Sequence, residues 1–205
     1  MSTLNEQAPG FELKNTNKEP VSLDSYKGQT VVLAFYPGAF TGVCDTEMCA
    51  FNDQLSKLND LNATVLGISV DSPWANGAFK DKYSLGFELL SDYDRSVITS
   101  YDVMFTGLGG LEGYTSSTRA VFILDKDGVV QYKWVAENPG VEPNYDEVVS
   151  KVADLNWFHS SPAYPDCAGE IPMPLSAAQK KENLLEAEKK AKQLFLEIED
   201  RGWIE

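Results

Sequence analysis

The chemistry of this chain is expected at Cys44, where a loop with proline and glycine gives way to a helical pattern. An apolar run over residues 31–35 indicates a buried strand, and residues 36–43 hold Pro37 and two glycines, which break regular structure. After the loop, apolar side chains recur every three or four residues on one helical face: Cys44, Met48, Phe51, Leu55 and Leu58. Cys44 therefore heads the buried face of a helix.

A cysteine in the first helical turn lies beside unpaired backbone N–H groups and the positive end of the helix dipole. Both favour an anion, so we expect the pKa of the Cys44 thiol to be lowered and its nucleophilic thiolate to be populated. Free cysteines are more often small core residues, and the apolar stripe would suit that role too. The position of Cys44 at the junction of loop and helix favours the reactive role.

The spacing of Pro37, Thr41 and Cys44 resembles the Pro-x-x-x-Thr/Ser-x-x-Cys signature of peroxiredoxins, the thiol-dependent peroxidases. The aromatic-Pro-Gly lead-in of those proteins is also present, at residues 36–38. The Cys44-x-x-x-x-Cys49 spacing is similar to that of the bacterioferritin-comigratory, or Q-type, branch. Arg119 opens an apolar strand, which resembles a second landmark of the family. The resemblance covers roughly residues 4–155 and is more specific than a lone short motif.

This resemblance implies an α/β, thioredoxin-like fold with a mixed central sheet flanked by helices. It also implies an antioxidant enzyme that reduces hydrogen peroxide and alkyl hydroperoxides with a thioredoxin- or glutaredoxin-like reductant. Cys44 would attack the peroxide. Thr41 would direct its hydroxyl at the reacting atoms, and Arg119 would provide a fixed cation beside them. Pro37 would shield the sulfur from water. Glu47, in the next turn, either orients Arg119 through a bidentate pair or is an ordinary exposed carboxylate.

The sulfenic acid formed on Cys44 must be resolved by a second thiol. Cys49 lies about 140° round the helix and roughly 8 to 9 Å away between Cα atoms, whereas a disulfide needs less than about 7 Å. The first helical turns must then unwind in every cycle. Cys167 lies in a proline-rich segment and would need no unwinding to reach Cys44. Its place in the chain loosely resembles the C-terminal resolving arm of dimeric two-cysteine peroxiredoxins, although the Val-Cys-Pro signature of that arm is absent here. We favour Cys49 because its spacing is the more specific signal.

Length and composition exclude several classes of function. The 205 residues suit one domain with an appendage, and the formal net charge of -14 argues against nucleic acid or an anionic membrane as partner. Without an apolar run long enough to span a membrane or an export signal at the first residues, we expect a cytoplasmic protein. The four candidate zinc ligands lack the paired spacing of a structural site, so neither metal nor cofactor is expected: Cys44, Cys49, Cys167 and His159.

The elements that must position these residues follow from the pattern of apolar side chains. In the first half of the chain we predict a hairpin of residues 11–13 and 21–23, a buried strand at 64–70, a helix from 72 to 83 and an edge strand at 87–90. In the second half we predict a short helix at 95–101, a hairpin of 119–124 and 129–135, and a helix at 143–155. Strands alternating with helices imply right-handed crossovers and a layered sheet. Four glycines between Phe105 and Gly113 predict a flexible connection beside the active site.

The chain is predicted to have two parts, a peroxiredoxin domain over residues 1–155 and a C-terminal part over 156–205. Prolines at 162, 165, 172 and 174 preclude a helix and indicate an extended arm over 156–174. A capping box at 176–179 then begins an amphipathic helix that ends near Gly202. Its apolar face must be covered, either by the domain or by a partner subunit in a homo-oligomer.

Two other functions use the same cysteine. A thiol-disulfide oxidoreductase would suit the fold, but the C-x-x-C spacing of such enzymes is missing. A non-enzymatic redox sensor would use Cys44 as a switch and the C-terminal helix as a docking element. Turnover of peroxide under saturating reductant distinguishes the peroxidase from both.

Overall fold

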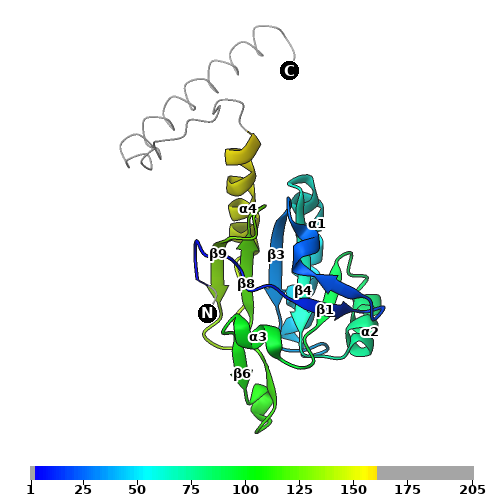
Figure 1. The fold of residues 1–205 in the computed structure, drawn as a ribbon. Helices are drawn as coiled ribbons and strands as arrows, with labels where there is room; N and C mark the ends of the chain where they lie inside the picture. Colours follow the sequence, from blue (N-terminus) through cyan, green and yellow to red (C-terminus); the bar gives the residue numbers. More distant parts are fainter. Residues whose placement is uncertain (1–2, 161–205) are drawn as a thin grey trace, which may run out of the picture. The chain divides into compact units, whose positions relative to one another are not determined.

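The structure is a computed structural model that describes residues 3–160, and the side chains of residues 3–155. It confirms the predicted mixed sheet, with seven strands in the order β2-β1-β5-β4-β3-β8-β9 (Figure 1). These strands are β1 (Glu12–Asn15), β2 (Pro20–Ser22), β3 (Thr30–Phe35), β4 (Ala63–Ser69), β5 (Glu88–Ser91), β8 (Ala120–Leu124) and β9 (Val130–Val135). The parallel pairs β3–β4 and β4–β5 occupy the middle, and antiparallel pairs complete both sides.

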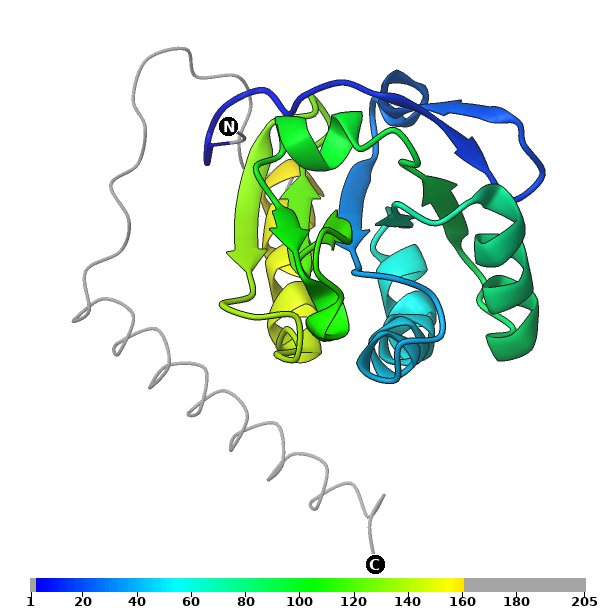
Figure 2. The same ribbon diagram turned by 90° about the horizontal axis from the view of Figure 1, so that it is seen from below.

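Helices cover both faces of this sheet. They are α1 (Val43–Asp60), α2 (Pro73–Tyr83), α3 (Ser96–Ser100) and α4 (Tyr145–Ser160). Figure 2 shows α1, α2 and α4 along one face and the short α3 on the other. Two buried apolar clusters match this arrangement, because Met48, Phe79 and Val152 belong to one and Ile98 to the other. The core therefore consists of two layers separated by the sheet.

Strand β3 lies inside the sheet between β4 and β8 and is buried along its whole length, as the apolar run over residues 31–35 predicts. Its last residue, Phe35, pairs with Ile68 of β4 in parallel and with Ala120 of β8 in antiparallel register. Arg119 immediately precedes β8, so it lies at the edge of the sheet where the chain leaves β3 towards Cys44. Sheet register thus brings together two parts of the chain that are far apart in sequence.

The N-terminal hairpin forms as predicted but extends the sheet, because Lys14 of β1 pairs with Ser91 of β5. The expectation that residues 87–90 form an edge strand is therefore wrong. The glycine-containing segment after Phe105 is also more regular than expected. It forms a separate two-stranded hairpin of β6 (Met104–Thr106) and β7 (Thr115–Ser117), with the short 3-10 turn η2 (Leu108–Gly110) between them. Four of its glycines have positive φ, which suits them to this tight connection.

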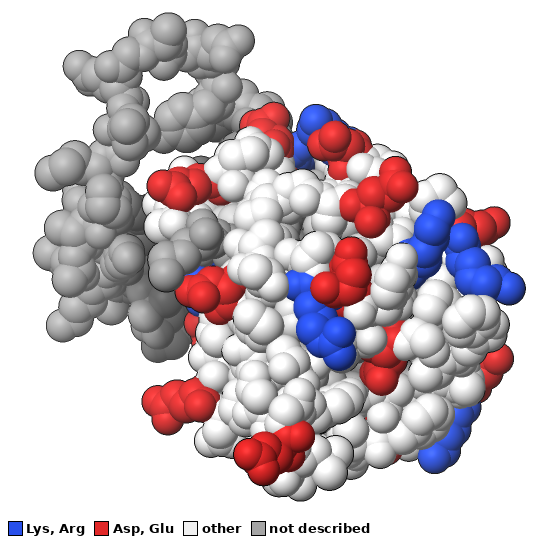
Figure 3. Space-filling view, turned by 60° about the horizontal axis from the view of Figure 1, so that its bottom comes forward, with Lys and Arg blue, Asp and Glu red and all other residues white. Residues whose placement is uncertain are grey.

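Helix α4 runs to Ser160, five residues into the segment expected to be an extended arm, because the first proline that precludes a helix is Pro162. The rest of the predicted arm, the capping box, the amphipathic helix, Cys167 and the side chain of His159 lie outside the described residues. Within residues 3–160, no helix has both the length and the apolar character needed to cross a membrane. On the face drawn in Figure 3, acidic side chains are spread over the surface with basic ones between them.

Candidate active site

The segment between β3 and α1 is held in an unusual backbone conformation. Phe40 has a φ of 63°, and Gly42 has φ 69° and ψ -79°. The N–H of Val43 donates to the carbonyl oxygen of Thr41 at 2.9 Å, which makes residues 41–43 a γ-turn of the strained, positive-φ kind. Glycine adopts this conformation without steric penalty. The turn brings the side chain of Thr41 back beside Cys44 at the start of α1.

The sulfur of Cys44 is fully buried and contacts two polar side chains. The hydroxyl oxygen Oγ1 of Thr41 lies 2.8 Å from Sγ, and Nη2 of Arg119 donates to Sγ at 3.2 Å. Thr41 Oγ1 is also 2.8 Å from the carbonyl oxygen of Gly38. Since a hydroxyl has one proton, Thr41 donates to Gly38 while accepting from the Cys44 thiol, or turns its proton to the sulfur after ionisation.

Arg119 is held on three sides and is only 2 % exposed. Its Nε donates to the carbonyl oxygen of Pro139 at 2.7 Å, its Nη1 pairs with Oε2 of Glu47, and its Nη2 reaches Cys44. Glu47 is fully buried, so the alternative of an exposed carboxylate is wrong. The pair is not bidentate, because Oε1 of Glu47 has no hydrogen-bond partner. The guanidinium is therefore fixed in place before any substrate binds.

Burial raises the pKa of the Cys44 thiol above that of an ordinary cysteine. The hydrogen bond of Thr41, the charge of Arg119 and the backbone of Gly38 lower it, and the charge of Glu47 raises it. The prediction of a lowered pKa is wrong in direction because withdrawing the sulfur from water disfavours the charged form more strongly than the nearby donors favour it. Burial likewise raises the pKa of Glu47 to about 7, against the opposing charge of Arg119.

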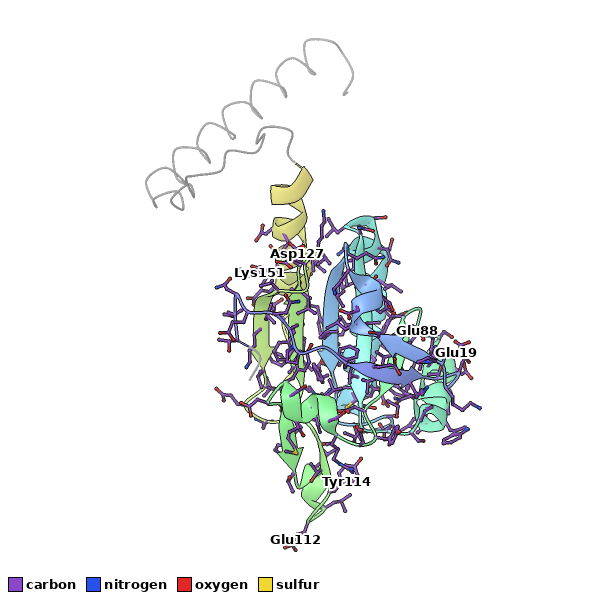
Figure 4. The ribbon with its side chains drawn as sticks, viewed as in Figure 1. Glu19, Glu88, Glu112, Tyr114, Asp127 and Lys151 are labelled. Carbon is purple, nitrogen blue, oxygen red and sulfur yellow. The ribbon has the colours of Figure 1, made fainter. Side chains whose placement is uncertain are left out.

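An open pocket of about 630 Å³ leads to these residues. Thr41 and Arg119 supply its polar groups next to Cys44. The other lining residues are mostly apolar and come from the start of α1, the β6–β7 hairpin and the loop after β9: Val43, Phe105, Leu108, Leu111, Tyr114 and Pro139. Figure 4 shows Tyr114 on the hairpin that projects from the sheet, with Glu112 near its tip. A small molecule entering the pocket would meet a hydroxyl and a guanidinium beside the sulfur.

Three of the predicted residues, Thr41, Cys44 and Arg119, are thus brought together by direct contacts. Pro37 is buried in the same loop and carries no N–H of its own. Cys49 lies farther along α1, partly buried, and both cysteines are free thiols. Burial, with a smaller effect of Asp53, raises the pKa of Cys49. Among the described residues, no group of acidic, histidine and cysteine side chains has the arrangement of a metal site.

Two further residues belong to the site although the sequence analysis did not single them out. Asp71 follows β4, and its Oδ2 accepts the N–H of Ala39 at 2.7 Å. Tyr114 lines the pocket, and burial followed by the charge of Asp71 raises its pKa. A signal for Asp71 was present, because polar residues after neighbouring parallel strands gather at one edge of a sheet. Tyr114 had no comparable signal.

Comparisons with known proteins identify the family to which the chain is similar. Residues 4–133 match the AhpC/TSA family. The chain is 40% identical over 131 residues to the putative peroxiredoxin bcp of Coxiella burnetii, a match that covers 64% of this chain and 87% of that protein. It is 36% identical over 131 residues to peroxiredoxin Bcp of Bacillus subtilis, a match that covers 64% of this chain and 83% of that protein. Among solved structures, peroxidoxin BcpB from Mycobacterium tuberculosis aligns with a TM-score of 0.66 at 25% identity, covering 76% of this chain and 99% of that one.

Proposed function

The chain belongs to the AhpC/TSA family, and from this membership we propose that Cys44 is the nucleophile that attacks the substrate, with Thr41 and Arg119 assisting. The protein is a thiol-dependent peroxidase with a thioredoxin-like fold, and it uses a hydroperoxide as substrate and a thiol as reductant. One observation carries the assignment of roles. Two polar groups from separate elements, Thr41 Oγ1 and Arg119 Nη2, converge on one sulfur at 2.8 and 3.2 Å.

In the first step the Cys44 thiolate attacks an oxygen of the hydroperoxide. An S–O bond forms, the O–O bond breaks, and the departing oxygen leaves as water or an alcohol after taking the proton that the thiol has lost. Negative charge develops on that oxygen in the transition state. Arg119 is a fixed donor beside it, and the hydroxyl of Thr41, held next to the sulfur, helps to orient the hydroperoxide in the pocket. Pro37 adds cover without adding a competing donor.

In the second step Cys49 attacks the sulfenic acid of Cys44, forming a disulfide and releasing water. The proposal rests on the five-residue spacing within α1. In a regular helix the two Cα atoms lie roughly 8 to 9 Å apart, so this step requires the first turns of α1 to unwind. Cys167, outside the described residues, is the alternative resolving thiol. A dithiol protein of the thioredoxin or glutaredoxin class then reduces the disulfide by thiol exchange.

The C-terminal part of the chain has a separate place in this proposal. Its predicted amphipathic helix, outside the described residues, is proposed to pack on the domain or to join two subunits. Sedimentation of the full chain and of a chain that ends at residue 160 would distinguish these two arrangements. A dimer that persists after the truncation would exclude the helix as the joining element.

Oxidation of the full chain by one equivalent of hydrogen peroxide, followed by mass spectrometry, tests the assignment of cysteines. We expect a Cys44–Cys49 disulfide in the wild type and no consumption of peroxide by Cys44→Ser, since a hydroxyl at this site does not ionise near neutral pH. Cys49→Ser is the matched control, because it retains Cys44 and should still consume one equivalent. Peroxide consumption by Cys44→Ser at the wild-type rate would contradict the proposal.

A further inference from the structure

Asp71 is connected to Cys44 through the backbone of the loop between them. The N–H of Ala39, which donates to Asp71 Oδ2 at 2.7 Å, and the carbonyl of Gly38 are the two ends of one peptide group. That carbonyl oxygen lies 2.8 Å from Thr41 Oγ1, which in turn lies 2.8 Å from Cys44 Sγ. An uninterrupted series of hydrogen bonds therefore leads from the carboxylate to the sulfur.

The carboxylate that begins this series is itself held in place. The hydroxyl of Ser69 contacts Oδ2 of Asp71 at 3.1 Å and accepts the backbone N–H of Asp71 at 3.2 Å. The hydroxyl of Ser91, on the neighbouring strand β5, donates to the backbone carbonyl of Asp71 at 2.5 Å. The anion is thus presented to Ala39 from the rigid ends of two core strands.

A negative charge at the N–H end of a peptide group polarises it, so that its carbonyl oxygen becomes a stronger acceptor. In this site the effect favours the orientation in which Thr41 donates its proton to Gly38. A lone pair of Thr41 Oγ1 is then directed at Cys44 and the adjoining pocket, where it accepts the S–H of the thiol or the O–H of a hydroperoxide. Without the carboxylate, the carbonyl of Gly38 would be a weaker acceptor and would hold the hydroxyl less firmly in this orientation.

We propose that Asp71 is a positioning residue for peroxide reduction, because it orients the hydroxyl of Thr41 through the peptide that joins Gly38 to Ala39. The proposal rests on the roles proposed above for Cys44 and Thr41. The carboxylate of Asp71 is bonded to Ala39 and Ser69 rather than to the sulfur, and Asp71 is not among the residues that line the pocket. We expect its effect on the rate to pass through Thr41, and this distinguishes it from a residue that merely supports the loop.

The test is a double-mutant cycle of Asp71→Ala and Thr41→Val, read by the second-order rate of Cys44 oxidation by hydrogen peroxide in a single turnover. Asp71→Ala removes a hydrogen bond to a charged group. With Thr41 present, this loss should slow the oxidation of Cys44 by about ten- to a hundredfold. In the Thr41→Val background, the same substitution should change the rate by less than about twofold, because the group through which it acts is gone. Equal losses in the two backgrounds would overturn the proposal.

Two further variants separate positioning from loss of structure. Asp71→Asn retains an acceptor oxygen for Ala39 but no charge, so its rate should lie between those of the wild type and Asp71→Ala. Asp81→Ala, which removes an exposed carboxylate from α2, controls for the change in net charge and should oxidise at the wild-type rate. Alkylation of Cys44 by iodoacetamide, which does not use the oriented hydroxyl, should not slow in Asp71→Ala; a parallel loss of alkylation would contradict the proposal.

These outcomes also separate failure of the positioning role from failure of the proposed function. If wild-type Cys44 is not oxidised by hydrogen peroxide at all, the assignment of the nucleophile is wrong. If the wild type reacts and the two substitutions are simply additive, only the role of Asp71 is wrong.

Discussion

Nη2 of Arg119 donates to Sγ of Cys44 at 3.2 Å, although 75 positions separate the two residues in the chain. The same guanidinium pairs with Glu47, which lies one turn after Cys44 on α1. One buried cation therefore faces two groups that can be negatively charged. The ionisation of the thiol depends on burial, which raises its pKa, and on Arg119, which is one of the groups that lower it.

Replacing Arg119 by alanine should raise the pKa of Cys44 still further, because the charge that opposes burial is lost. The pH profile of Cys44 alkylation, measured in a chain whose other cysteines are serine, would shift to higher pH. Arg119→Lys is the control, since it keeps the charge but loses the planar fork that also binds Pro139 and Glu47. An alkylation profile that does not move in Arg119→Ala would show that the cation has no influence on the thiol.

Removing the hydroxyl of Thr41 should slow peroxide reduction while leaving the sheet and α1 intact. Loss of one fixed group at the reacting oxygens typically costs about 3 to 4 kcal/mol of barrier, or roughly a hundred- to a thousandfold in rate. Thr41→Val keeps the shape of the side chain, and Thr41→Ser restores the hydroxyl. Single-turnover oxidation should be slow in the first variant and nearly normal in the second; similar rates in both would contradict the assignment.

Glu47 should make the stability of the protein fall as pH rises through its folded pKa. Burial raises that pKa from 4.5 to about 7, so the folded state binds more protons than the unfolded state between these values. The contribution of Glu47 to the free energy of unfolding is fully present below about pH 4.5 and is lost towards pH 7. This loss is on the order of 3 kcal/mol over the interval. Glu47→Gln cannot titrate, so urea unfolding of the two proteins should show the wild type losing stability relative to the variant as pH rises. Parallel curves would contradict this expectation.

The choice of resolving thiol can be read from two single substitutions. If Cys49 resolves, Cys49→Ser should accumulate sulfenic or sulfinic acid on Cys44 and lose turnover with thioredoxin, while Cys167→Ser turns over normally. Intact-mass measurement after peroxide treatment distinguishes these products. A reducible dimer on a non-reducing gel that vanishes in Cys167→Ser and persists in Cys49→Ser would assign the role to Cys167.

Much of the fold could be predicted because its signals are local. The apolar run of β3, the glycine-containing loop and the spacing of Cys44, Met48 and Phe51 identify strand, turn and helix within about thirty residues of sequence. The pairing of β1 with β5 was missed, since nothing local in a short strand specifies its neighbour across the sheet. The end of α4 was misplaced because no helix-stopping residue occurs before Pro162.

By itself, the sequence determined which residue types are available for chemistry: Pro37, Thr41, Cys44 and Arg119 could all be named because their order and spacing resemble the landmarks of peroxiredoxins. Only the tertiary structure decided the state of the thiol and the partners of the charges. The pKa of Cys44 depends on how completely the surrounding layers exclude water, and Asp71 accepts the N–H of Ala39 only because β3 and β4 end at the same edge of the sheet. Solvation and sheet register depend on residues that are distant in sequence, so the local pattern does not contain them.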